Sequence, residues 1–226
     1  MKNSATFLSG CEQTPIALKE LRGVILFTAS YMAAAVLGAW LSGNAEFAFY
    51  IVVMLILISL VVRVHYMVRL SRGVLWGLSI WGFLHMAGGL VPVPASWPIA
   101  GEIRVLYSLW LIPGMLKYDQ ITHAFGFGVT TWVCWQALCS GQLAGFDLKP
   151  TFGRLVLCVM AGMGFGALNE VIEFLAVLTL PETNVGGYYN TGADLVANLF
   201  GTIIAAALIR AKYRRSTKAE VAHETS

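Results

Sequence analysis

Six long apolar stretches constrain the fold of this chain more than any other feature of its sequence. Each stretch has about the 17–25 residues that a helix needs to cross a hydrocarbon core of about 30 Å. None shows period-two alternation, and in lipid only helices or closed barrels satisfy the backbone polar groups. The sequence therefore predicts an all-α, polytopic membrane helix bundle with about six transmembrane helices. The stretches cover residues 23–41, 46–62, 73–93, 121–138, 155–180 and 193–209.

The composition excludes a water-soluble domain, because 58% of the 226 residues are hydrophobic and only 12% are charged. We expect a cytoplasmic N-terminal segment at 1–22, one transmembrane domain at 23–210 and a polar cytoplasmic tail at 211–226. The net charge of +3 is ordinary, and most of the basic residues flank apolar stretches, where they meet anionic lipid headgroups. Membrane lipids are therefore the expected partners, and nothing in the sequence favours nucleic acid.

Lysine and arginine are distributed unevenly between alternate loops. Thirteen of the fifteen lie in the N-terminal segment, the second and fourth loops and the tail, whereas the odd loops hold only Arg104 and Lys117. Basic residues near membrane helices stay on the cytoplasmic side. We therefore predict that both termini are cytoplasmic and that residues 94–120 and 181–192 lie outside.

The third loop contains an apolar segment that is too short to span. Residues 105–112 are rich in leucine and aromatic residues and follow two prolines, Pro94 and Pro98. Such a segment favours the membrane interface or a re-entrant half-helix. We expect a segment near 105–115 that covers whatever lies beneath it.

Polar side chains occur in the outer halves of four of the apolar stretches. Asp119 and His123 are spaced i, i+4, and Glu170 and Glu173 are spaced i, i+3, so each pair shares one face of its helix. The deepest of them lies about 15 Å below the outer helix ends. The full set is His85, Asp119, His123, Asn169, Glu170, Glu173, Asp194 and Asn198.

Structural roles are the alternative for several of these residues. Asp119 and Asp194 stand near predicted helix starts, where an acid caps free N–H groups. His123 could bond a backbone carbonyl, and His85 could be a satisfied core histidine.

The glutamate pair is harder to explain by structure alone. Burying two carboxylates costs several kcal/mol each unless they are paired, protonated or bound to a cation. No lysine or arginine lies at their depth, and only Arg104 and Lys117 could reach down from the rim. The pair therefore predicts either shared protons or a bound metal.

Two imidazoles with several carboxylates suit a divalent metal such as Zn²⁺, Mn²⁺ or Fe. Helix bundles build such centres from i, i+3 and i, i+4 pairs on facing helices. We assign Glu170, Glu173 and Asp119 as candidate catalytic residues, with Asn169 and Asn198 lining the site. The predicted metal ligands are His85, His123, Glu170, Glu173 and Asp194.

Three motifs, in this order, carry a family resemblance: Tyr118-Asp119-x-x-x-His123, Asn169-Glu170-x-x-Glu173-Phe174 and Tyr189-Asn190-Thr191-x-x-Asp194. Over residues 75–205 the chain resembles the YjdF-type bacterial inner-membrane proteins and, more distantly, the VanZ-like glycopeptide-resistance membrane proteins. It departs from the former at Asn169, Phe174, Asn190 and Ala193. The resemblance implies a multi-pass protein of the bacterial inner membrane with a link to the cell envelope, and it implies no particular reaction.

Three functions are compatible with these observations. The first is a metal-dependent hydrolase or transferase acting on a lipid or isoprenoid-linked substrate at the outer leaflet. The second is a non-catalytic accessory protein that binds a metal or a lipid headgroup. The third is a proton- or cation-coupled transporter, although the inner halves of the last three stretches offer few polar groups for a path.

Two further expectations concern small residues. Glycines at helix-packing spacing predict close helix contacts, and they are Gly73, Gly77, Gly162, Gly164 and Gly166. The cysteines include no C-x-x-C pair and lie in the predicted cytoplasmic half, so we expect free thiols. They are Cys11, Cys134, Cys139 and Cys158.

Overall fold

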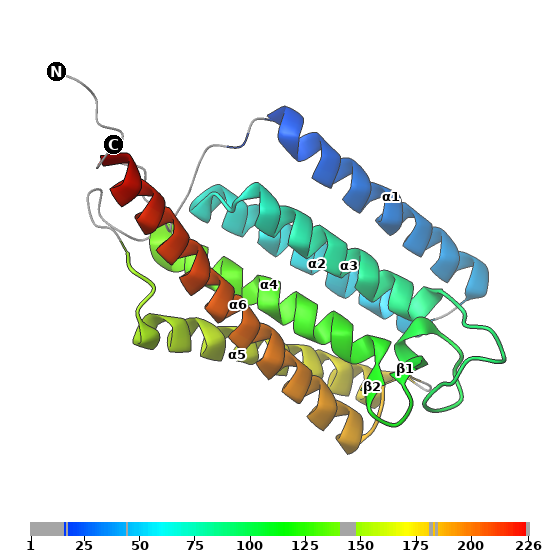
Figure 1. The fold of residues 1–226 in the computed structure, drawn as a ribbon. Coiled ribbons are helices and arrows are strands. Elements are labelled where there is room, and N and C mark those ends of the chain that lie inside the picture. The colour runs from blue at the N-terminus through cyan, green and yellow to red at the C-terminus, as the bar shows by residue number, and fades with distance from the viewer. Residues whose placement is uncertain are drawn as a thin grey trace.

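The computed structural model confirms the helical bundle (Figure 1). It describes residues 16, 18–43, 45–140, 148–180, 183 and 185–224. Within that part, each predicted apolar stretch forms one long helix, although residues 91–93 and 180 lie beyond the ends of their helices. Among the described residues, five of the helices are long and apolar enough to cross a membrane, and the exception is α4. The helices are α1 (Leu18–Ser42), α2 (Ala45–Val68), α3 (Arg72–Leu90), α4 (Tyr118–Ser140), α5 (Phe152–Thr179) and α6 (Tyr188–Glu224).

Helix α4 is the least apolar of the predicted spans because its polar residues face the inside of the bundle. Thr122, His123, Thr131 and Gln136 are all buried. The helix packs most extensively against α6 and also contacts α5 and α3. Neighbouring helices therefore shield its polar face, and a lower hydropathy is compatible with a central position.

The outer surface of the bundle is apolar. Leu26 on α1, Ile56 on α2, and Leu157 and Phe174 on α5 are all more than half exposed. A soluble protein would place polar residues at such positions, whereas lipid favours apolar ones. With the helix lengths, this surface makes the chain a multi-pass membrane protein.

Successive helices alternate in direction, so the odd connections gather at one end of the bundle (Figure 1). Residues 91–117 and the start of α6 lie at that end. The opposite end holds the α2–α3 and α4–α5 connections and the C-terminal part of α6, which carry most of the basic residues. The segment expected as a polar tail continues α6 as far as Glu224.

The sidedness of these two ends is testable with single cysteines. Ser96 and Thr217 are both exposed, at opposite ends of the bundle. Because basic residues stay cytoplasmic, an impermeant thiol reagent should label Ser96→Cys in intact cells and Thr217→Cys only after permeabilisation. The unsubstituted chain controls for its own cysteines. The reverse labelling pattern would place residues 91–117 in the cytoplasm.

The long third loop is an extended structure, so the half-helix alternative is wrong. It contains a 3₁₀ turn, η1 (Leu106–Ser108), and an antiparallel pair of short strands, β1 (Trp110–Ile112) and β2 (Leu116–Lys117). Additional bridges pair residue 92 with 105 and residue 99 with 109. The backbone of this segment therefore pairs within the loop rather than along a helix.

Two side chains fix the loop over the end of α3. The Arg104 guanidinium donates to the carbonyls of Pro94, Ala95 and Trp97 at 2.6, 2.9 and 2.7 Å. Tyr107 lies against Gly88, where an added Cβ would be only 2.6 Å from the Tyr107 ring. The loop thus covers the underlying helices, as expected from the sequence.

Close helix contacts depend on only some of the predicted glycines. A Cβ on Gly162 would be 2.3 Å from the Thr131 hydroxyl, and Gly77 and Gly166 are similarly close to side chains. Gly73 and Gly164 have nothing within 4 Å of an added Cβ, so the packing prediction was wrong for these two, which face open space.

The cysteines only partly follow the expectation of free thiols. Cys134 and Cys158 are free, and the buried Cys158 packs in a core cluster with Trp135 and Leu155. Cys139 belongs to the same cluster but is disulfide-bonded, so the prediction was wrong there. Cys11 lies outside the described residues.

Candidate functional site

His123 on α4 is the centre of a polar cluster at the loop-covered end of the bundle. Its side chain is buried, with 3% of the residue exposed. Its Nε2 atom lies 3.7 Å from Oδ1 of Asp119, one turn earlier on the same helix. Its Nδ1 atom lies 3.2 Å from Oδ1 of Asn198 on α6. The ring therefore contacts side chains rather than a backbone carbonyl, which excludes the structural alternative considered for it.

Helix α5 adds the two glutamates on the facing side. Glu170 Oε1 is 3.6 Å from His123 Nδ1, and Glu173 Oε1 is 3.9 Å from His123 Nε2. Asn169 donates from Nδ2 to Glu173 Oε1 at 2.8 Å. Hydrogen bonds between nitrogen and oxygen are about 2.7–3.2 Å long. Both ring nitrogens thus face carboxylates at distances longer than a direct hydrogen bond.

Helix α6 completes the cluster with Asn190, Asp194 and Asn198. Asn190 Nδ2 donates to Asp194 Oδ2 at 2.5 Å and lies 3.5 Å from Asp119 Oδ2. Asp194 and Asn198 have no exposed surface. Gly166 on α5 makes room for Asn198, because a Cβ there would be 2.5 Å from the Asn198 amide nitrogen.

Asp194 is not a helix cap. Helix α6 begins at Tyr188, earlier than the sequence predicted, so Asp194 lies in the second turn, beyond the free N–H groups of the first. Asp119, by contrast, is in the first turn of α4. The capping alternative is therefore wrong for Asp194 and compatible with the position of Asp119.

Two contributors to the cluster were missed as site residues. Lys117, at the end of β2 and only 8% exposed, places Nζ 3.5 Å from Asp119 Oδ2 and donates a short hydrogen bond to Asn190 Oδ1. Asn190 could have been found from its i, i+4 spacing to Asp194. Lys117 was considered from the sequence only as a basic residue that could reach down from the rim. Arg104, the other candidate counter-charge, binds loop carbonyls instead.

His85 does not join the donor atoms of the cluster. Its ring packs against Tyr107, Trp81 and Tyr50, with centroid distances of 5.5, 5.6 and 6.2 Å. His85 is in neither of the two groups of closely spaced ligand atoms, so the prediction of His85 as a metal ligand is not supported.

The four other predicted ligands form two groups that share His123, and one group also includes Asp119, which was predicted as a catalytic residue. Asp119, His123 and Asp194 make one group, and His123, Glu170 and Glu173 make the other. In each group the ligand atoms lie within 4.8 Å of one another. Ligand atoms on one ion with bonds of roughly 2.0–2.2 Å lie about 3–4 Å apart. The 4.8 Å limit is wider than this, so each group could hold one ion once its side chains contract around it.

Unsatisfied polar atoms point to the same conclusion. Both carboxylate oxygens of Glu170, Oδ1 of Asp194 and Nδ2 of Asn198 are buried without a hydrogen-bond partner among the described residues. Buried polar atoms without partners are rare and costly. Among the described residues, moreover, the four carboxylates face a single ammonium group, that of Lys117. A divalent cation would relieve both the unpaired oxygens and the excess negative charge.

Comparison with known proteins identifies a family without a described activity. A model of predicted membrane proteins (DUF2238) matches residues 23–215, which is most of the chain, and the chain therefore belongs to this family. No curated protein and no solved structure matches the chain.

Proposed function

We propose that this protein binds a divalent metal in the outer half of its bundle and acts on a lipid or isoprenoid-linked envelope substrate as a hydrolase or transferase. The main support is the set of unpaired carboxylate oxygens of Glu170 and Asp194 on either side of His123. The bacterial inner-membrane location rests on the YjdF-type resemblance, and the envelope substrate on the VanZ-like resemblance alone.

The donor set favours a hard metal. With His85 outside the cluster, His123 is its one imidazole among the described residues, and the other donors are carboxylate oxygens. Carboxylate-rich sites suit Mn²⁺ better than Zn²⁺, and iron carboxylate centres are built from similar ligands in helix bundles. Asp119, His123, Glu170 and Asp194 would hold the ion, which leaves Glu173 beside it as a base.

A metal bound there would supply Lewis acidity toward a phosphoryl or carbonyl oxygen. The chain itself supplies a base and a cation. Glu173, oriented by Asn169 at 2.8 Å, is placed to accept a proton. Lys117, at the rim and held by Asn190, is placed to attract an anionic headgroup. A phosphate-linked lipid has the chemistry that this combination would recognise.

A non-catalytic accessory role is the second candidate. Asp194 and Asn198 have no exposed surface, and His123 has very little. A metal enclosed by such residues would resemble a closed structural site, which lacks an open coordination position.

The transporter alternative gains little from the geometry. The hydroxyl groups of Thr130, Thr131 and Thr202, in the deeper parts of α4 and α6, donate to carbonyls of their own helices. Side chains bonded in this way leave few groups for a polar path toward the cytoplasm.

Metal analysis of the detergent-purified protein tests the proposal. After chelation and addition of Mn²⁺, the natural chain should retain the metal stoichiometrically. Glu170→Gln should weaken binding by roughly ten- to a hundredfold, as ligand-shell changes commonly do. Glu102→Gln, an exposed loop residue, is the matched control and should bind normally.

Two outcomes of this experiment separate the candidates. Metal-dependent cleavage of a lipid phosphate, lost in Glu170→Gln, would support the enzyme, whereas metal binding without turnover would favour the accessory role. Absence of bound Mn²⁺, Zn²⁺ and Fe²⁺ in the natural chain would contradict both.

A further inference from the structure

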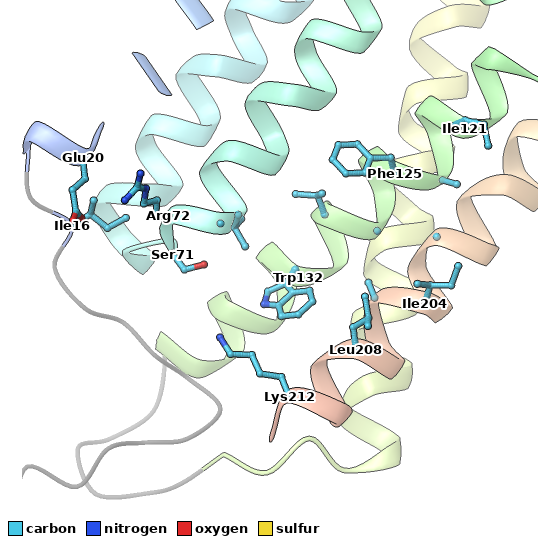
Figure 2. Close-up of a pocket in the computed structure, with 17 residues that line it drawn as sticks. Ile16, Glu20, Ser71, Arg72, Ile121, Phe125, Trp132, Ile204, Leu208 and Lys212 are labelled. Atoms are coloured by element: carbon cyan, nitrogen blue, oxygen red, sulfur yellow. The ribbon is translucent and has the colours of Figure 1, made fainter. Parts of the chain in front are cut away.

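A large apolar groove runs along α4 and α6 (Figure 2). No residue of the His123 cluster lines it. Its volume is about 980 Å³. One wall is a stripe of α4 that includes Ile121, Phe125 and Trp132, and the other is a stripe of α6 that includes Ile204 and Leu208. These residues recur at three- to four-residue spacing, so each stripe is one helix face. The groove is therefore built from two adjacent apolar faces.

The groove is at least as long as one leaflet of a bilayer, because its α4 wall also reaches Ile121 in the first turn of α4. From Gly201 to Lys212 the α6 wall rises roughly 16 Å at 1.5 Å per residue. This is about half of a hydrocarbon core of about 30 Å. The groove begins at the end of the bundle where most basic residues lie, the predicted cytoplasmic end. An acyl chain of the inner leaflet can thus lie along it.

The mouth of the groove is polar and carries net positive charge. Arg72 and Ser71, at the start of α3, and Lys212, on α6, line it together with Glu20 of α1 (Figure 2). Among the described lining residues, two cations thus stand against one carboxylate. Basic residues at the inner membrane surface attract anionic headgroups.

We propose that this groove binds one phospholipid with an anionic headgroup, its phosphate at Arg72 and Lys212 and an acyl chain along α4 and α6. The charge at the mouth selects the headgroup, and the apolar stripes hold the tail. The site is distinct from the His123 cluster and does not depend on the proposed catalytic function.

Native mass spectrometry of the detergent-purified protein tests the headgroup. Phosphatidylglycerol and phosphatidylcholine with identical acyl chains are the probes. The natural chain should retain phosphatidylglycerol preferentially. Arg72→Gln with Lys212→Gln should reduce this preference by roughly fivefold for each basic residue removed. The matched control, Arg214→Gln with Arg215→Gln, removes the same charge from exposed positions on α6 outside the groove. This control should keep the preference for phosphatidylglycerol.

A pair of glycine variants tests the groove itself. Gly73 lines the groove, whereas Gly153 does not. The two positions are otherwise alike, because each is the second residue of its helix and has nothing within 4 Å of an added Cβ. Gly73→Leu should weaken retention of both lipids, and Gly153→Leu should not.

Three results would overturn the proposal. An equal loss of preference in both charge variants would indicate only general surface charge. Unchanged retention in Gly73→Leu would place the lipid elsewhere. The natural chain could also retain no lipid, while Ile204→Cys forms cross-links between two copies of the chain. Those two results together would make the groove a protein interface.

Discussion

Replacing both Glu170 and Glu173 with glutamine is expected to give a folded protein that is at least as stable as the natural chain in metal-free buffer. Glutamine keeps the shape and hydrogen-bonding capacity of each side chain but removes its charge. In the natural chain these carboxylates are enclosed with Asp119 and Asp194, and Glu170 accepts no hydrogen bond from the described residues. Removing closely spaced like charges lowers the cost of burial.

Mn²⁺ should raise the melting temperature of the natural chain but not that of the double glutamine variant. A ligand at a hundred times its Kd stabilises the folded state by about 2.7 kcal/mol. For a chain of this size each kcal/mol shifts the melting temperature by roughly 2–4 °C. The natural chain should therefore gain roughly 5–10 °C with Mn²⁺, and the double variant should gain almost nothing.

Glu102→Gln is again the control, because its carboxylate lies in an exposed loop, and it should respond to Mn²⁺ as the natural chain does. A double variant that melts much earlier than the natural chain without metal would show that the glutamates hold the helices together. The cluster would then be a structural network and not a metal centre.

The sequence was sufficient for the architecture because a membrane restricts the possible folds. Span length predicted every long helix, and the alternation of basic loops predicted which connections share one end. The start of α6 was missed because Tyr188, Asn190 and Gly192 read as a polar loop. In the structure Asn190 is instead bonded to Asp194 and Lys117, so tertiary contacts stabilise a first turn that local sequence does not favour.

The sequence predicted which site residues pair within one helix. It did not predict which side chains from different helices and loops come into contact. Spacing alone placed Asp119 with His123 and Glu170 with Glu173. It gave no information on the rotation of α3, which turns His85 toward Tyr50 and Tyr107, beside Trp81 of the same helix. Lys117 was missed as a site residue because a two-residue strand, β2, carries it to Asp119 and Asn190. Side chains that enter from loops depend on tertiary structure more than on periodicity.

Gly201→Ala should have a large effect on the same site although it changes none of the proposed ligands. Gly201 on α6 lies against the backbone of α4, where an added Cβ would be 1.9 Å from the Ala124 carbonyl oxygen. Backbone atoms cannot rotate away as a side chain can, so α4 and α6 must separate. Overpacking of this kind costs about 1–3 kcal/mol, and we expect the melting temperature to fall by roughly 2–12 °C.

Gly164→Ala is the matched control, because Gly164 is also within a long helix but has nothing within 4 Å of an added Cβ. Alanine there should be neutral or stabilise by up to about 1 kcal/mol. Metal affinity provides the second readout. Ala124 follows His123, and Asn198 lies one turn before Gly201, so helix separation stretches the 3.2 Å contact between His123 and Asn198. Gly201→Ala should therefore also weaken Mn²⁺ binding. A variant with unchanged melting temperature and unchanged affinity would show that the α4–α6 contact does not set the geometry of the cluster.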